Sequence, residues 1–149
     1  MNSKQIVKKM DDLTFFNELS KKEKNTLSEL EDYVMQYGPA EKILKEGMVD
    51  DGFYILLDGR VSVTKNKPPE ITVAQLVPGA IFGEITLRGN RPRTSSITAD
   101  DDVVALKIDR PLINRELDPV LANKIKDQVI DLLVRRLDEM NNKLVGFVR

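Results

Sequence analysis

The sequence predicts one mainly β domain of the α+β class, an antiparallel sandwich or barrel between N-terminal helices and a long C-terminal helix. Apolar residues recur with helical spacing near both ends, and short apolar or alternating runs separated by turn residues fill the middle. With 149 residues, of which 41% are hydrophobic, the chain can bury one core. We therefore expect a single domain over 1–149, with helices over 1–32, strands over 33–109 and helices over 110–145.

Helical spacing marks the N-terminal part. Ile6, Met10 and Leu13 fall at i, i+4 and i+7, which places them on one face of a helix. Ser20 is followed three positions later by Glu23, which is the pattern of a capping box. The pattern predicts that a second packing helix begins directly after Ser20.

The middle of the chain has the pattern of short strands. The runs "FYILL", "GRVSVTK", "ITVAQLV", "SSITA" and "DVVALKI" are apolar or alternate with period two. Turn signals such as Gly38-Pro39, Asp51-Gly52, Asp58-Gly59 and Pro78-Gly79 separate the runs. Asp58-Gly59, between "YILL" and "RVSV", also predicts a two-residue hairpin.

The sequence of the C-terminal part predicts one long helix that begins at Asp118-Pro119. Two apolar strips follow it: a seam with coiled-coil spacing of 3, 4, 3 and 4, and an adjacent second strip. The seam is Ile130, Leu133, Leu137, Met140 and Leu144, and the second strip is Ile125, Val129 and Leu132. Two strips need two partners, so we expect a homodimer through this helix, the second partner being its own β domain. The alternative is one wide face against a single core.

The composition argues against several classes of function. There are 23 basic and 24 acidic residues, which does not favour a general nucleic-acid binder. The chain has no histidine and no cysteine, so it lacks the commonest general base and any thiolate chemistry. We expect no enzyme activity and no bound metal. The start "MNSKQIVKKM" lacks the apolar core of a signal peptide, and no apolar run approaches the roughly 20 residues of a membrane span. These features predict a cytoplasmic protein without a membrane partner.

The segment "FGEITLRGNRPRTSS", residues 82–96, combines three arginines, one carboxylate and three consecutive hydroxyls. Arginine, backbone N–H groups and hydroxyls together are the groups that hold a phosphate. Glu84 would repel a bare phosphate, but it suits a ligand that also presents sugar hydroxyls. A sugar phosphate therefore explains the whole cluster. The alternative is a charged surface loop in which Glu84 pairs with Arg88 at i+4.

The order of these residues closely resembles the phosphate-binding cassette of the cyclic-nucleotide-binding family, F-G-E-[LI]-x-L followed by P-R-[AT]-[AS]-[ST]. The stretch "ILKEGMVDDGFYILLDGRVSV" resembles the glycine-marked hairpin segment of the same family, although Asp50 stands where that family usually has glycine. The resemblance covers roughly residues 15–145. It implies an antiparallel double-stranded β-roll, jelly-roll-like, with flanking helices and with cAMP or cGMP as ligand.

The resemblance also implies roles for single residues. Gly83 would offer a backbone N–H, Glu84 would accept the proton of the ribose 2′-hydroxyl, and Arg93 and Thr94 would bind the cyclic phosphate. The expected ligand-binding set is Phe82, Gly83, Glu84, Ile85, Thr86, Arg93, Thr94, Ser95 and Asn141. In this family, threonine at position 94 is associated with tolerance of guanine, but it also occurs in cAMP receptors.

The stretch "RRLDEMNNKL" resembles the long dimer helix of the bacterial catabolite-activator family. That resemblance implies that Asn141 recognises adenine, either within one subunit or across a dimer; the alternative is that Asn141 lies in a solvated helix end. In those regulators a helix-turn-helix domain follows, whereas this chain stops at Arg149, so we expect no direct DNA binding and an unknown protein effector. The sequence thus predicts a regulatory sensor, cAMP being favoured, whose C-terminal helix is repositioned by the ligand. The alternatives are a ligand-free dimerisation module and a carboxylate-based cyclic-nucleotide hydrolase.

Overall fold

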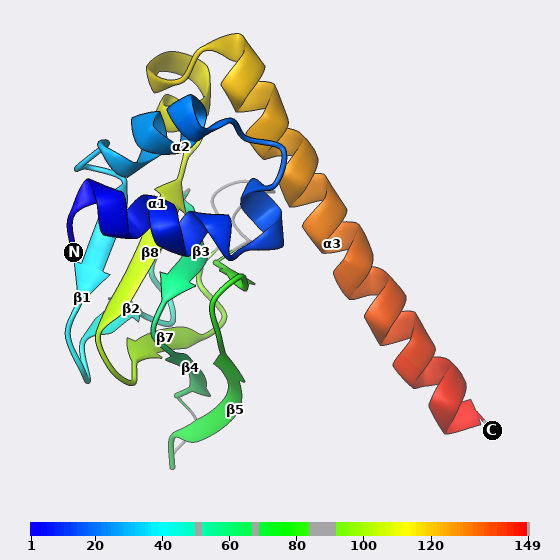
Figure 1. The fold of residues 1–149 in the computed structure, drawn as a ribbon. Helices are drawn as coiled ribbons and strands as arrows, with labels where there is room; N and C mark the ends of the chain where they lie inside the picture. The colour runs from blue at the N-terminus through cyan, green and yellow to red at the C-terminus, as the bar shows by residue number, and fades with distance from the viewer. Residues whose placement is uncertain (50–51, 67–68, 84–91, 149) are drawn as a thin grey trace.

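The computed structural model describes residues 1–49, 52–66, 69–83 and 92–148, which form a β-roll packed against helices (Figure 1). Its helices are α1 (Ser3–Asp11), η1 (Thr14–Phe16), α2 (Lys21–Ser28), η3 (Leu112–Glu116) and α3 (Pro119–Val148). Its strands are β1 (Val34–Tyr37), β2 (Lys42–Leu44), β3 (Phe53–Asp58), β4 (Val61–Lys65), β5 (Ile71–Leu76), β6 (Ile81–Phe82), β7 (Ser96–Ala99) and β8 (Val103–Ile108).

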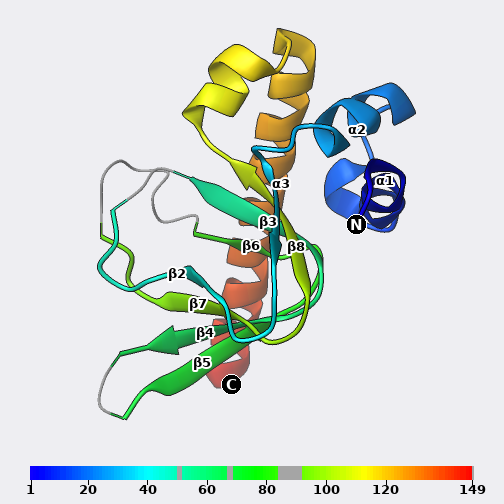
Figure 2. The same ribbon diagram turned by 90° about the vertical axis from the view of Figure 1, so that its left-hand side faces the viewer.

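The described strands form two four-stranded sheets, with orders β1-β8-β3-β6 and β2-β7-β4-β5. All of their pairings are antiparallel. The two sheets lie one above the other in Figure 2, with α3 running behind them and α1 and α2 to one side. The predicted fold class, an antiparallel β-roll flanked by N-terminal helices and a long C-terminal helix, is confirmed.

The predicted hairpin at Asp58-Gly59 is wrong. Asp58 pairs with Val104 in one sheet, whereas Val61 pairs with Leu76 in the other. The link between Asp58 and Val61 therefore connects the two sheets and does not close a hairpin. Gly59 has φ +85°, and a Cβ there would lie 2.2 Å from the backbone oxygen of Asp102. The glycine is needed because two turns approach each other closely, which is a different demand from that of a hairpin.

Two apolar cores share strand β3. Phe53, Ile55 and Leu57 belong to the core between this sheet and the helices, while Tyr54 and Leu56 belong to the core inside the roll. Because successive side chains of a strand point to opposite faces, a strand buried on both faces must be apolar at every position. This explains why "FYILL" is a continuous apolar run without alternation.

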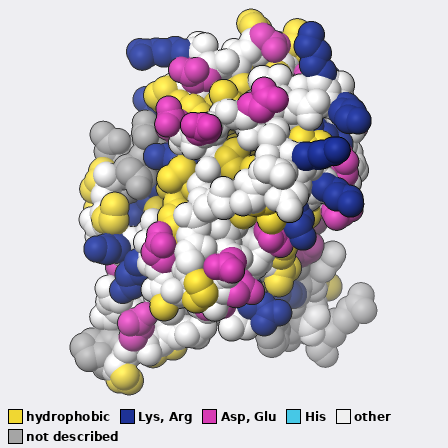
Figure 3. Space-filling view, turned by 60° about the vertical axis from the view of Figure 1, so that its left-hand side comes forward, with side chains coloured by type: hydrophobic (Ala, Val, Ile, Leu, Met, Phe, Trp, Pro, Cys, Tyr) yellow, Lys and Arg dark blue, Asp and Glu magenta, His cyan; other side chains and the backbone are white. Residues whose placement is uncertain are grey.

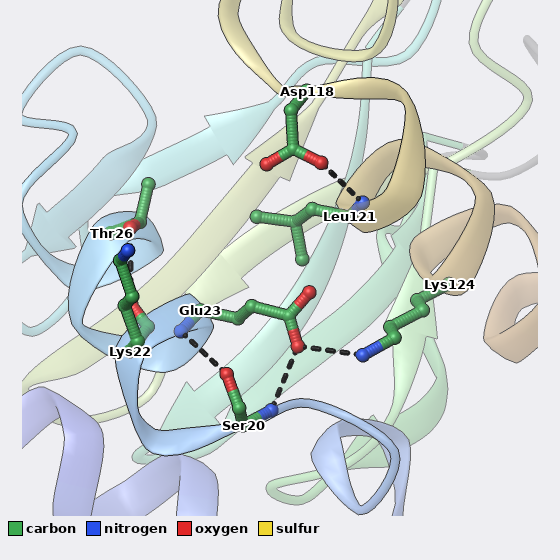
Figure 4. Close-up of polar contacts among 7 residues, drawn as sticks. All are labelled: Ser20, Lys22, Glu23, Thr26, Asp118, Leu121 and Lys124. Atoms are coloured by element: carbon green, nitrogen blue, oxygen red, sulfur yellow. Dashed lines mark hydrogen bonds and ion pairs between the residues drawn. The ribbon is translucent and has the colours of Figure 1, made fainter.

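Local capping bonds fix both helix starts that the sequence predicts. The Ser20 hydroxyl accepts a bond from the Glu23 N–H at 3.1 Å, and the Glu23 carboxylate accepts one from the Ser20 N–H at 2.8 Å. The Asp118 carboxylate accepts a bond from the Leu121 N–H at 3.0 Å. The same Glu23 carboxylate accepts a bond from Nζ of Lys124 at 2.8 Å, which joins α2 to α3 (Figure 4).

Helix α3 has two unlike halves. Ile125 and Val129 are buried against the core that the helices share with the sheet, as the second apolar strip predicts. From Val134 to Gly146 every residue is exposed, and this half extends away from the roll (Figure 1). Among the described residues, no helix is long and apolar enough to cross a bilayer.

Candidate functional site

Arg93 is the centre of the candidate site, and its side chain is only 5% exposed. Its guanidinium donates to the backbone oxygen of Gly83 at 2.7 Å and to that of Gly52 at 2.5 Å. Its own N–H donates to the Met48 oxygen at 2.7 Å, and its oxygen accepts from the Gly47 N–H at 2.8 Å. Main-chain atoms of three separate segments therefore fix both ends of Arg93.

Gly83 lies directly against this guanidinium. Its φ is +79°, and a Cβ at this position would lie 2.6 Å from Nη1 of Arg93 and 3.3 Å from Cδ1 of Leu44. The conformation favours glycine, and the space admits no side chain unless Arg93 shifts. Gly83 is thus the residue that allows the main chain to approach the arginine.

Thr94 and Ser95 continue from Arg93 at the edge of the same site. The Thr94 side chain is exposed and that of Ser95 is half-buried. The Thr94 carbonyl accepts a bond from Nζ of Lys65, which ties this segment to β4. The hydroxyl of buried Ser96 accepts a bond from the Glu46 N–H at 2.9 Å. These bonds hold the segment that presents the two hydroxyls.

A cavity of about 510 Å³ opens beside these residues. It falls within the range of about 300–1,000 Å³ that is typical of small-molecule sites. Its walls come from β2, β4, β5, β6, β7 and α3, and they include Phe82, Gly83, Arg93, Thr94, Ser95, Leu132, Arg135, Arg136 and Glu139. The cavity therefore brings together five of the nine ligand-binding residues that the sequence predicts, namely Phe82, Gly83, Arg93, Thr94 and Ser95.

Four of those wall residues belong to α3, and they are not among the ligand-binding residues predicted from the sequence. Leu132, Arg135, Arg136 and Glu139 are spaced i, i+3, i+4 and i+7, so they share one face of the helix. Their spacing was visible in the sequence, but nothing there indicated that this face meets the roll. The two arginines and the glutamate add charge of both signs to the cavity wall.

An aromatic pair supports the cavity from inside the roll. The rings of Tyr54 and Phe82 stack with centroids 5.1 Å apart and an interplanar angle of 7°. Phe82 is buried and also lines the cavity. Burial, followed by the neighbouring Tyr54 hydroxyl, raises the pKa of the Tyr37 phenol well above its usual range. Tyr54 is a core residue, and Tyr37 packs against the same core.

The remaining predicted site residues are not in the described cavity. Glu84, Ile85 and Thr86 lie outside the described residues, as do Asp50, Arg88 and Arg91. Asn141 is exposed, is not among the wall residues and lies about 180° around α3 from Leu132, at about 100° per residue. Its predicted contact with adenine stays a prediction. The described residues contain no group of three or more side chains suited to a metal ion.

Curated relatives that share sequence with this chain include two proteins of cyclic-nucleotide-dependent kinases. The cAMP-dependent protein kinase type II regulatory subunit of Drosophila melanogaster is 33% identical over 110 residues, which is 73% of this chain and 27% of the relative. A cGMP-dependent protein kinase of Eimeria tenella is 38% identical over 104 residues, which is 69% of this chain and 10% of that kinase. The chain thus spans about a quarter of one relative's length and a tenth of the other's.

Solved structures share the fold over nearly the whole chain. A cyclic nucleotide-binding domain from Methylobacillus flagellatus matches with a TM-score of 0.68 and 25% identity, covering 97% of this chain and 83% of its own. The Thermus thermophilus catabolite activator protein matches with a TM-score of 0.64 and 26% identity, covering 90% of this chain and 62% of its own.

The family model described as "Cyclic nucleotide-binding domain" matches residues 34–118. The match begins with β1, ends just before α3 and includes the whole segment 82–96. It covers more than half of the chain, and it agrees with the fold and with the residues gathered at the cavity. The chain therefore belongs to the cyclic nucleotide-binding domain family.

Proposed function

We propose that this chain binds a cyclic nucleotide in the cavity beside Arg93 and acts as a non-catalytic regulatory module in the cytoplasm. The observation that carries the proposal is the burial of Arg93 with its guanidinium held by the Gly83 and Gly52 carbonyls. Burying a guanidinium is costly unless charge and hydrogen bonds compensate for it. A cationic group fixed at a cavity wall is well suited to an anionic ligand such as a cyclic phosphate.

The neighbouring groups support the same ligand. In this proposal Arg93 and Thr94 bind the cyclic phosphate, Gly83 offers its backbone N–H, and Ser95 and Phe82 line the pocket. Glu84 takes the ribose hydroxyl, with Ile85 and Thr86 beside it, although these three lie outside the described residues. Figure 3 shows basic and acidic side chains interspersed over one face of the molecule, which suits recognition of a small anion better than that of a polyanion.

Helix α3 is the proposed response element. It supplies Leu132 and Glu139 to the cavity wall, and Lys124 ties its first turns to α2. A ligand in the cavity contacts this wall, so it stabilises the α3 position that fits it best and shifts the population toward that position. The output is a homodimer through α3 that signals to a protein effector.

We propose cAMP as the preferred ligand on the basis of the match to a cAMP-dependent kinase regulatory subunit over 73% of this chain. cGMP is the competing ligand, since another relative is a cGMP-dependent kinase. The two ligands differ at the purine, and the α3 wall adds charged side chains to the cavity beyond Arg93 and Thr94, which bind the phosphate directly in this proposal.

Isothermal titration calorimetry of the purified chain with cAMP, cGMP and 5′-AMP tests the proposal. We expect saturable heat with both cyclic nucleotides, tighter binding of cAMP, and much weaker binding of 5′-AMP, whose phosphate carries more charge and is not cyclic. Absence of both heat and thermal stabilisation at near-millimolar cyclic nucleotide would overturn the proposal. Analysis of the recovered ligand for 5′-AMP tests the non-catalytic assignment.

A second candidate is an interaction module that keeps the fold without a ligand. The observation that favours it is the exposed apolar side of α3, which includes Ile130, Leu137 and Leu144. Normal self-association together with no cyclic-nucleotide binding would select this second function.

A further inference from the structure

A second cavity, of about 590 Å³, lies where the start of β3, the end of β8, η3 and the first turns of α3 meet. In Figures 1 and 2, η3 (yellow) and the start of α3 (orange) lie side by side at the top of the molecule. Small-molecule sites typically measure about 300–1,000 Å³, so the second cavity is large enough for a ligand. None of the described residues that line it also lines the cavity beside Arg93 (the nucleotide cavity). A ligand in the second cavity would therefore make contacts of its own.

The floor of the second cavity is apolar. Phe53 and Ile108, which are partners on adjacent strands, form its sheet side, and both are buried. Ile125 and Val129, one turn apart on α3, form its helix side and are buried as well. Half-buried Ile113 adds a side from η3. Apolar side chains of the sheet, η3 and α3 therefore surround a space that favours an alkyl chain over water.

The mouth of the second cavity is open to solvent. Ile130 of α3 lines the cavity and keeps 59% of its surface exposed, and Asn114 of η3 is an exposed lining residue as well. The apolar surface thus continues from the buried floor to the outside along α3. A ligand can enter from solvent without separating η3 from α3, because both elements already present exposed side chains at the cavity.

The rim of the second cavity carries two cations. Arg110, between β8 and η3, and Lys126 of α3 both line the cavity and are both exposed. Among the ion pairs of the described residues, neither cation has a carboxylate partner. Asp109 is the one carboxylate among the described lining residues, and it accepts a bond from the Leu112 N–H at 2.9 Å. The rim therefore offers two unpaired cations beside one carboxylate that already holds the start of η3.

We infer that the second cavity binds an amphipathic carboxylate, a molecule with an alkyl chain and one carboxylate head, such as a medium-chain fatty acid. The chain occupies the apolar floor and displaces water from it. The head lies at the rim, where the planar fork of Arg110 and the charge of Lys126 both suit a carboxylate. A cationic head would lie beside two cations, and a sugar would leave its hydroxyls without partners against the floor.

The inference is independent of nucleotide binding. The two cavities use different turns of α3: Ile125 and Val129 line the second cavity, whereas Leu132 and Arg136 line the nucleotide cavity. The phosphate-binding residue Arg93 does not line the second cavity. The chain can therefore hold an amphipathic carboxylate and a cyclic nucleotide at the same time.

Isothermal titration calorimetry of the purified chain with decanoate, kept below the concentration at which it forms micelles, tests the inference. We expect saturable binding to one site and a raised melting temperature. Hexanoate has the same head and four fewer methylenes, and should bind more than tenfold more weakly, since each buried methylene contributes about a three- to fourfold change in affinity. Decyltrimethylammonium has the same chain length and the opposite charge, and should bind more weakly than decanoate. No saturable binding of decanoate, or equal binding of all three probes, would overturn the inference.

Variants of the rim test where decanoate binds. Arg110→Gln and Lys126→Gln should each weaken decanoate binding about threefold, as expected for exposed charge pairs. Arg115→Gln is the matched control, because Arg115 is an exposed cation of η3 that does not line the cavity, and its affinity for decanoate should equal that of the wild type. Wild-type affinity in both rim variants would overturn the inference.

Excess cAMP distinguishes the second cavity from the nucleotide cavity, which also has arginines and apolar walls. Saturable binding of decanoate should persist in the presence of cAMP. Competition between the two for one site would place decanoate in the nucleotide cavity and would overturn the inference. A chain that binds decanoate with the expected rim dependence but binds no cyclic nucleotide supports the inference and rejects the proposed function alone.

Discussion

Glu23 and Lys124 are 101 residues apart in the sequence, yet Oε1 of Glu23 lies 2.8 Å from Nζ of Lys124. The same carboxylate oxygen accepts the Ser20 N–H and so completes the capping box of α2 (Figure 4). One side chain therefore fixes the start of α2 and attaches the first turns of α3 to it. The attachment matters because the next turns of α3 form a wall of the cavity.

Replacing Lys124 with methionine should destabilise the chain. The Lys124 side chain is 36% exposed and that of Glu23 is 16% exposed, so solvent screens the pair in part. We expect a loss of about 0.5–1 kcal/mol in the free energy of unfolding, measured with urea. Lys24→Met is the matched control, because Lys24 pairs with Asp11 at the same 2.8 Å but does not reach α3. Greater protease sensitivity of α3 only in Lys124→Met would locate the effect; equal sensitivity would contradict it.

The same pair predicts a pH dependence. The bond from Lys124, followed by the Ser20 N–H, lowers the pKa of Glu23 below its ordinary value of 4.5. A lowered pKa in the folded state means that the stabilisation is complete above pH 4.5 and is lost as the pH falls through the lower folded value. Glu23→Gln keeps an acceptor for Ser20 but does not titrate, so its unfolding free energy should fall less steeply below pH 4.5. Parallel stability curves for the two proteins would refute this.

Gly83→Ala should weaken cyclic-nucleotide binding. The alanine would adopt φ +79° and place its Cβ 2.6 Å from Nη1 of Arg93, so the guanidinium must move from the Gly83 carbonyl. Strain at positive φ costs about 1 kcal/mol or more in stability. The added displacement of Arg93 should lower the affinity for cAMP by about tenfold, which calorimetry measures directly.

Gly79→Ala is the control that separates the effect of backbone strain at positive φ from the effect of the contact with Arg93. Gly79 also has positive φ, at +95°, but a Cβ there meets only Cδ2 of Leu13 at an ordinary 3.6 Å. We expect a similar loss of stability with little change in affinity. If both variants lose affinity equally, the contact with Arg93 is not the cause.

Interactions between near neighbours in the chain could be predicted from sequence. The capping box of Ser20 and Glu23 and the cap at Asp118 each join residues three apart, so the residue pattern contains the whole interaction. The turn at Gly59 could not be predicted in this way. Its geometry depends on Asp102, more than forty residues away, and a local pattern cannot distinguish a hairpin from a close approach of two turns.

The same distinction applies to the candidate site: residues within one short segment could be predicted from sequence, and those on α3 could not. Phe82, Gly83, Arg93, Thr94 and Ser95 could be assigned because their order within one short segment is specific. The α3 wall could not, since the face of a helix that meets the roll depends on how the helix crosses it. For the same reason the sequence placed Leu133 in the exposed seam, whereas the structure packs it against the core of its own chain.

Charge at the α3 wall should tune affinity in opposite directions. Arg135 and Glu139 both line the cavity and are both exposed, so each acts on the nucleotide phosphate through screened Coulomb interaction. Arg135→Gln should weaken cAMP binding about two- to threefold at low salt, and Glu139→Gln should strengthen it by a similar factor. Both effects should shrink as ionic strength rises. Changes of the same sign, or changes insensitive to salt, would argue against an electrostatic role for this wall.

Arg93 should have the largest effect of any described side chain on ligand affinity. Arg93→Ala removes the buried guanidinium, and loss of a charge-assisted pair with phosphate should cost roughly 2–4 kcal/mol of binding free energy in calorimetry. Arg93→Lys keeps the charge but cannot reproduce the fork that bonds Gly83 and Gly52, so it should recover only part of the affinity.

Two controls make the Arg93 result decisive. Both variants also lose bonds that hold the site together, so urea unfolding must show that each is folded at the temperature of the titration. Arg60→Gln is the matched control: Arg60 is exposed and is not among the cavity residues, and its bonds with Asp101 and Asp100 involve its backbone N–H and carbonyl, which the substitution keeps. Its affinity for cAMP should equal that of the wild type. If folded Arg93→Ala also binds cAMP as tightly as the wild type, the cyclic phosphate is not held at this arginine.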